Sequence, residues 1–151
     1  MQFAKRLDNV ETSAIRELFK LLGKPGIISF AGGFPDSAMF DVVGIQEAAN
    51  KALTENPGMA LQYGATEGFG PLREQLAAFM ATKGAKDVYA DNLMVTTGSQ
   101  QALDLLGKCM ISPGDKVIVE GPTFLATIQC FRLYGAEVIS APVDANGVIV
   151  E

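Results

Sequence analysis

Apolar residues recur at helical spacing in three stretches of the first half of the chain. The predicted helices cover residues 12–22, 41–54 and 71–83. Thr12 or Ser13 can cap the first helix, Pro71 suits the first turn of the third, and Gly84 suits its end. A short apolar run at 27–30 predicts a strand that opens into a glycine-rich loop. Paired glycines there permit backbone angles that other residues avoid, which favours a loop close to another group.

The second half of the chain alternates strand-like runs with amphipathic helices. The predicted strands are residues 93–97, 116–120 and 137–141, and the predicted helices are residues 99–110 and 123–134. This βαβαβ order predicts an α/β fold with a mainly parallel sheet, helices on both faces and right-handed crossovers. Ligands of such sheets bind at the carboxyl ends of the strands. The loops at 97–101 and 121–124 are therefore the expected binding loops.

Composition narrows the classes of function. A hydrophobic share of 48% in 151 residues predicts a folded domain. The net charge of −5, with scattered lysines and arginines, argues against nucleic-acid binding. Histidine is absent, which removes Ser-His-Asp and Cys-His catalysis and the His-bearing zinc sites, so no metal site is expected.

The same composition bears on the compartment. No apolar run approaches the roughly 18 residues of a membrane span, and the start lacks the pattern of a signal peptide. Cys109 and Cys130 fall among apolar helical residues, which suits small core side chains better than a disulfide. We therefore expect a cytoplasmic protein that does not bind membranes.

The loop Thr97-Gly98-Ser99-Gln100-Gln101 carries the first chemical signal. It runs from a predicted strand through one glycine into a helix, where free amide hydrogens and the positive end of the helix dipole can hold a phosphate. The alternative is that Ser99 only caps its helix. The loop lacks the glycine patterns of dinucleotide and nucleoside-triphosphate sites.

Two aromatic residues lie in further loops. Phe124 follows Glu120-Gly121-Pro122-Thr123 and would place a ring beside the phosphate loop, which suits a planar cofactor. The alternative is a core residue at the start of a helix. Tyr63 stands in a glycine-rich segment at 61–73 that favours an ordered loop near a ligand or partner, or a plain turn before a helix.

Taken in order, these segments resemble the class I and II aminotransferases, which share the fold of aspartate aminotransferase. The chain is most similar to the branch with 2-aminoadipate and kynurenine aminotransferases. The residues that carry this similarity are Ser13-Ala14-Ile15-Arg16-Glu17-Leu18, Ile28-Ser29-Phe30-Ala31-Gly32-Gly33-Phe34-Pro35, Leu61-Gln62-Tyr63 and Thr97-Gly98-Ser99-Gln100-Gln101-Ala102-Leu103. The resemblance covers essentially the whole chain but only about the first third of a family member. It implies an N-terminal arm and substrate-entrance loop at 1–35 and the first portion of the cofactor-binding large domain at 36–151.

The resemblance also implies roles for particular residues. In similar enzymes the equivalents of Ser99 and Gln100, next to Gly98, hold the phosphate of pyridoxal 5'-phosphate. The equivalent of Phe124 stacks on the pyridine ring, and that of Tyr63 reaches the phosphate and substrate site of the other subunit in a homodimer.

Three further positions match the substrate entrance of the aminoadipate branch: Ser13, Arg16 and Gly33. Arg16 has an alternative reading as part of the solvated face of the first helix. The substrates implied by the resemblance are an amino acid and a 2-oxo acid, between which an amino group is exchanged.

No lysine of the chain stands in the serine-rich context of the family's Schiff-base lysine. We therefore expect no catalytic residue among these residues, and a chain that is inactive alone because it is the front part of a longer enzyme. A second reading is a truncated, non-catalytic module that acts in dimerisation or anion binding. A third, the effector domain of a transcription regulator, would need a winged-helix segment before Ser13, where twelve residues leave no room for one.

Overall fold

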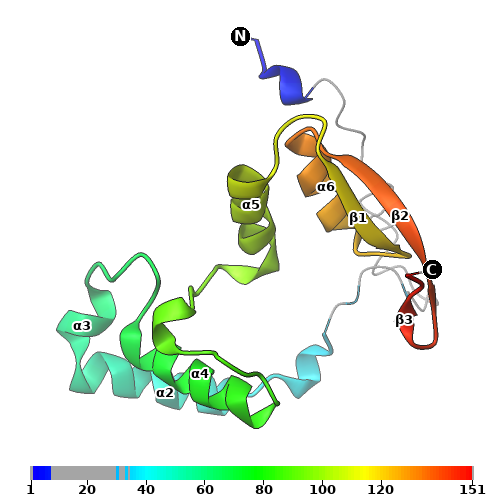
Figure 1. The fold of residues 1–151 in the computed structure, drawn as a ribbon. Helices are drawn as coiled ribbons and strands as arrows, with labels where there is room; N and C mark the ends of the chain where they lie inside the picture. The colour runs from blue at the N-terminus through cyan, green and yellow to red at the C-terminus, as the bar shows by residue number, and fades with distance from the viewer. Residues whose placement is uncertain (1, 8–29, 31–32, 34, 151) are drawn as a thin grey trace, which may run out of the picture. The chain divides into compact units, whose positions relative to one another are not determined.

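A computed structural model describes residues 2–7, 30, 33 and 35–150. The chain divides into two compact units, one of Thr12–Thr66 and one of Met1–Glu11 with Glu67–Glu151. The elements in chain order (Figure 1) are η1 (Lys5–Leu7), η2 (Ser37–Met39), α2 (Val42–Glu55), α3 (Pro57–Leu61), α4 (Gly70–Thr82), η3 (Ala90–Asn92), α5 (Gly98–Met110), β1 (Lys116–Gly121), α6 (Leu125–Leu133), β2 (Glu137–Asp144) and β3 (Gly147–Val148). No helix in these ranges is long and apolar enough to cross a membrane. The helix predicted at 12–22 and most of the strand predicted at 27–30 lie outside the described residues.

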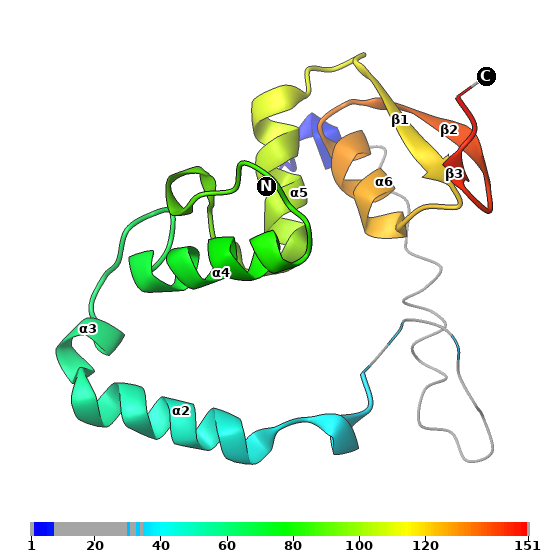
Figure 2. The ribbon, with the colours of Figure 1, turned by 60° about the horizontal axis from the view of Figure 1, so that its bottom comes forward.

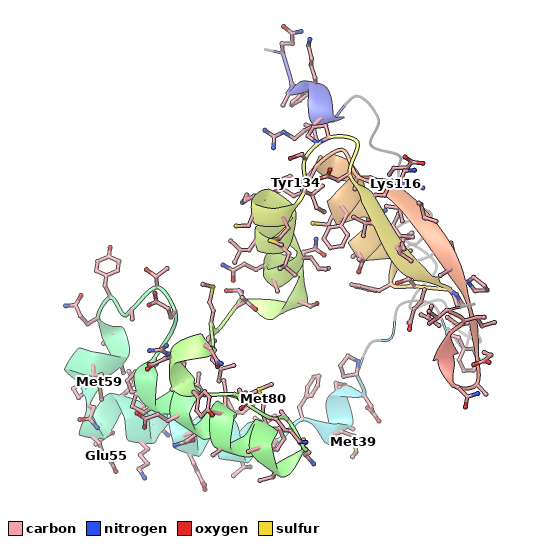
Figure 3. The ribbon with its side chains drawn as sticks, in the orientation of Figure 1. Met39, Glu55, Met59, Met80, Lys116 and Tyr134 are labelled. Atoms are coloured by element: carbon pink, nitrogen blue, oxygen red, sulfur yellow. The ribbon has the colours of Figure 1, made fainter. Side chains whose placement is uncertain are left out.

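In the unit Thr12–Thr66, α2 confirms the helix predicted at 41–54. It begins at Val42 because the Asp41 side chain accepts a hydrogen bond from the Gly44 N–H at 2.9 Å. The short helix α3, which was not predicted, follows α2. Pro57 occupies its first turn, where a missing N–H has no consequence. Figure 3 shows Glu55 at the end of α2 and Met59 on α3.

In the other unit, α4 confirms the helix predicted at 71–83. Pro71 lies in its first turn, as expected. Gly84 adopts a φ of +87°, and the Ala85 N–H donates to the Met80 carbonyl at 3.1 Å, which ends the helix as predicted. The short helix η3 packs against α4.

The C-terminal part forms a three-stranded sheet in the order β1-β2-β3. β1 and β2 are parallel, in a register that runs from Lys116 opposite Glu137 to Gly121 opposite Pro142. α6 connects them and contacts β2, and α5 packs against α6. β3 returns antiparallel to β2 through a tight turn, in which the Asn146 N–H donates to Asp144 Oδ1 at 2.7 Å.

Two parts of the predicted architecture are wrong for the described residues. Residues 93–97 form no strand, so the order is βαβ followed by a hairpin rather than βαβαβ, and the sheet is mixed rather than mainly parallel. A strand requires a partner, and the Val95 N–H instead donates to the Glu67 carbonyl at 2.9 Å. Helices do not cover both faces of this sheet within residues 35–150: the paired Ile118 and Ile139 are 70% and 39% exposed.

The core of the described part is small. Its buried apolar residues are Cys130 and Ala136, at the contact between α6 and the start of β2. The expected burial of Cys130 is confirmed, but Cys109 on α5 is exposed. The apolar sides of α2 and α4 remain accessible, with Ile45 67% and Phe79 58% exposed. Few contacts among the described residues therefore cover these two helices.

Candidate functional site

The first turn of α5 is the centre of the candidate site. Thr97 is its N-cap residue, but its side chain makes no capping hydrogen bond. Gly98, Ser99 and Gln100 follow as the first three helical residues, and all three are exposed. First-turn N–H groups have no acceptor within their own helix, so they point outward with the positive end of the helix dipole. The N-cap position is thus occupied by Thr97, and Ser99 is the second helical residue.

Gly98 gives the loop a backbone shape that other residues resist. Its φ is +75°, in the left-handed region. A Cβ placed on it would meet no atom within 4 Å, so the requirement for glycine comes from the backbone angle rather than from crowding. The open space beside Gly98 is what a ligand that approaches the backbone closely would need.

Gln101 stabilises the start of the helix in a way that the sequence did not reveal. Its Oε1 accepts a hydrogen bond from the Thr97 N–H at 2.5 Å, the reverse half of a capping box. The usual spacing for such a box is three residues, which would have assigned this task to Gln100. Because Gln101 performs it, the amide of Gln100 is not used for the cap.

Phe124 lies at the second expected loop, immediately after β1. It is the N-cap residue of α6 and is 62% exposed among the described residues. The preceding Gly121 is required by the close passage of β2, because a Cβ there would lie 3.2 Å from the Ala141 carbonyl oxygen and closer still to the Ser140 hydroxyl. Figures 1 and 2 show α5 and α6 side by side, with their N-termini at the end of the sheet where β1 and β2 end. The two loops thus lie at the same end of the sheet, as predicted.

A side-chain cluster holds α5 against α6. The Tyr134 hydroxyl, just after α6, donates to Asp104 Oδ1 at 2.5 Å, and Lys108 Nζ lies 2.6 Å from Asp104 Oδ2. Figure 3 shows Tyr134 between the two helices. The ring of Tyr134 also packs on Gly107, which is buried. These contacts fix how the two helices lie relative to one another.

The cluster changes the proton affinities of its members. The hydrogen bonds from Lys108 and Tyr134 lower the pKa of Asp104. The hydrogen bond to Asp104 raises the pKa of both Lys108 and Tyr134. The cluster is therefore a neutral tyrosine and an ion pair at ordinary pH. Nearby, burial raises the pKa of the Cys130 thiol, which makes this thiol a structural group rather than a nucleophile.

The remaining predicted site residues lie in the other unit. Tyr63 is 98% exposed, and its backbone N–H donates to Gln62 Oε1 at 2.8 Å. Gly33 adopts a φ of +52°, which fits the expected glycine-dependent loop. Ser13 and Arg16 lie outside the described residues. Among the described residues, no group of three His, Cys, Asp or Glu side chains is placed to hold a metal ion.

Comparison with known proteins agrees with the geometry. The family model for aminotransferase class I and II matches residues 26–149. The aromatic-amino-acid aminotransferase 1 of Thermococcus litoralis is 42% identical over 99% of this chain and 36% of its own length. The 2-aminoadipate transaminase of Thermus thermophilus is 41% identical over 96% of this chain and 35% of its own length. The kynurenine aminotransferase of Pyrococcus horikoshii, solved with PMP, superposes with a TM-score of 0.87 at 41% identity, over 98% of this chain and 36% of its own.

The chain therefore belongs to the aminotransferase class I and II family. It spans about a third of the length of these relatives.

Proposed function

We propose that the protein carrying this chain is a pyridoxal-phosphate-dependent aminotransferase that transfers an amino group between an amino acid and a 2-oxo acid. The observation that carries the proposal is the first turn of α5, where the Thr97 side chain caps no N–H group, with the left-handed Gly98 and the exposed Ser99 and Gln100. Relatives solved with PMP or with N-(5'-phosphopyridoxyl)-L-leucine support the same cofactor.

The residues present fit this cofactor by the chemistry of their groups. A phosphate dianion needs several hydrogen-bond donors and a positive potential. The first-turn N–H groups of α5, the Ser99 hydroxyl and the Gln100 amide supply both. A planar ring needs an apolar face, and the exposed Phe124 stands in the loop between the end of β1 and the start of α6. When bound, the cofactor withdraws electrons from the bond to be broken in the amino acid.

The chain's own residues bind and orient in this proposal. Gly98, Ser99 and Gln100 fix the phosphate, Phe124 holds the ring against rotation, and Tyr63 completes the phosphate site of a partner subunit in a homodimer. At the entrance of the site Ser13, Arg16 and Gly33 select the substrate side chain. The proton transfers need a lysine in the serine-rich context that none of these 151 residues provides, so we place that group elsewhere in the protein.

The substrate class follows from the relatives. Enzymes named for 2-aminoadipate, kynurenine and aromatic amino acids lie at similar identity to this chain. We infer an enzyme that accepts long side chains, both acidic and apolar.

The visible absorption spectrum of the full-length protein with pyridoxal 5'-phosphate tests the proposal. We expect a cofactor band that changes on addition of 2-aminoadipate, kynurenine, leucine or glutamate and is restored by a 2-oxo acid. A protein that binds the cofactor without any such change would support a non-catalytic module instead. A protein that binds no cofactor would refute the proposal.

A further inference from the structure

The segment 93–97 leads directly into the first turn of α5 but belongs to no strand of the described part. Its position is therefore not set by a sheet ladder. It is set by contacts with residues 67–73, at the end of the glycine-rich loop and the start of α4. These contacts determine where the phosphate loop begins.

Two of the contacts involve Val95. Its backbone N–H donates to the Glu67 carbonyl at 2.9 Å. Gly68, which follows Glu67, has a φ of +105°. A Cβ on Gly68 would come 2.8 Å from Val95 Cβ and Cγ2. The two backbones approach so closely that only glycine fits at position 68.

The third contact is made by Arg73 in the first turns of α4. Its Nη1 donates to the Ala90 carbonyl at 2.9 Å and, at the longer distance of 3.5 Å, to the Leu93 carbonyl. The side chain is half-buried, and its Nε is buried without a hydrogen-bond partner among the described residues. A buried donor without an acceptor is unfavourable, so hydration does not explain the position of this guanidinium. Its hydrogen bonds to the two carbonyl acceptors do.

We propose that Arg73 is a positioning residue for the phosphate loop: it fixes residues 90–93 on α4 and thereby sets where Gly98, Ser99 and Gln100 present their donors. The inference rests on the proposed function. Arg73 itself touches no cofactor. Its role follows from chain continuity, because only four residues separate Leu93 from Gly98, and one of them, Val95, bonds back to Glu67 beside the start of α4.

An anchor at Arg73 affects phosphate binding through the geometry of the hydrogen bonds. Hydrogen bonds to a phosphate weaken steeply once the donors move away from their best distance and angle. A left-handed glycine at position 98 permits many backbone angles, so it cannot by itself hold the loop in one of them. An anchor upstream of the loop supplies that restraint.

The test compares two ligands that differ by the phosphate alone, pyridoxal 5'-phosphate and pyridoxal, in the full-length protein. The ratio of their dissociation constants measures what the phosphate loop contributes. Arg73→Lys keeps the charge and most of the stem but loses the planar fork, and Arg73→Met keeps only the stem. The same two substitutions at Arg132, which is exposed in the last turn of α6, are the matched controls.

We expect Arg73→Lys and Arg73→Met to weaken binding of the phosphorylated ligand at least fivefold and to leave binding of pyridoxal within twofold. The Arg132 variants should change neither. An unchanged ratio, an equal loss for both ligands, or failure of Arg73→Lys to fold would each assign Arg73 to general stability and overturn the inference. A wild-type protein that binds both ligands equally would refute the proposed function itself, which separates that failure from a failure at Arg73.

Discussion

Tyr134 and Gly107 lie in direct contact between α6 and α5: a Cβ added to Gly107 would come 2.7 Å from Tyr134 Cε2 and closer still to Cδ2. The absence of a side chain at position 107 therefore lets the tyrosine ring approach the helix backbone. The same approach brings the Tyr134 hydroxyl to Asp104, one turn earlier on α5.

Replacing Gly107 with alanine should push the ring away from α5. We expect overpacking to destabilise the fold by about 1 to 3 kcal/mol, despite the better helix propensity of alanine. Thermal unfolding of the full-length protein measures the loss. Gly58→Ala in α3 is the control, because a Cβ there meets no atom within 4 Å. Equal melting temperatures for the two variants would show that the ring does not pack on Gly107.

The Asp104 cluster predicts a dependence of stability on acidity. Because its hydrogen bonds lower the pKa of Asp104, the folded state is favoured above the unfolded-state pKa, and this gain is lost as the pH falls through the folded-state pKa. We expect the wild type to be more stable than Asp104→Asn at neutral pH, with a gap that closes below about pH 4. Melting temperatures across this range measure the gap. In a Tyr134→Phe background, which lacks one donor to Asp104, the gap at neutral pH should be smaller. A gap that stays constant with pH would contradict the prediction.

The phosphate loop predicts a large effect on cofactor retention. In the full-length protein, Ser99→Ala combined with Gln100→Ala removes two side-chain donors. Each hydrogen bond to a charged oxygen contributes about 1.5 to 3 kcal/mol, so the dissociation constant of the cofactor should rise a hundredfold or more. Equilibrium dialysis measures it, and Gln75→Ala, an exposed glutamine on α4, is the control. Unchanged affinity with a folded protein would remove Ser99 and Gln100 from the site.

Tyr63 predicts active sites shared between two subunits. A subunit with Tyr63→Ala and a subunit without its cofactor-binding lysine should each be inactive as homodimers. Mixed dimers should regain activity at one of their two sites, because each site takes its tyrosine from one subunit and its lysine from the other. Activity is measured on heterodimers purified by two affinity tags. Heterodimers that stay inactive would place Tyr63 in the site of its own subunit or outside it.

Arg16 predicts a preference among substrates. A guanidinium at the entrance can pair with a distal carboxylate and swing aside for an apolar side chain. Arg16→Ala should therefore reduce kcat/KM for 2-aminoadipate or glutamate tenfold or more, about 1.4 kcal/mol, and barely change it for leucine. The leucine reaction controls for folding. An equal loss for both classes would assign Arg16 to structure, and no loss would return it to the solvated face.

The elements with strong local signals could be predicted from the sequence. Helices with a cap or a stop, such as the Asp41 start of α2 and the Gly84 end of α4, were found within a residue or two. β1 was found to the same precision, and β2 begins where predicted but runs three residues further, to Asp144; the apolar runs of both are flanked by turn formers. The starts of α5 and α6, and so the two candidate loops before them, followed from the helical patterns, although the strand predicted before the first loop is absent from the described residues.

What could not be predicted depends on contacts between distant residues. The segment 93–97 has the composition of a strand, but strand formation is decided by a partner, and its Val95 bonds to Glu67 instead. The use of Gln101 rather than Gln100 as the capping group depends on side-chain geometry at the turn. The anchor at Arg73 spans 20 residues to Leu93, which no local pattern reveals.

The parallel arrangement of α5 and α6 affects the stability of this helix pair. Two helices that lie side by side and point the same way place like partial charges next to each other, so their dipoles repel. A dianion at the shared N-terminal end offsets this repulsion. If the proposed cofactor binds there, we expect its binding to slow hydrogen exchange throughout the α5–α6 pair.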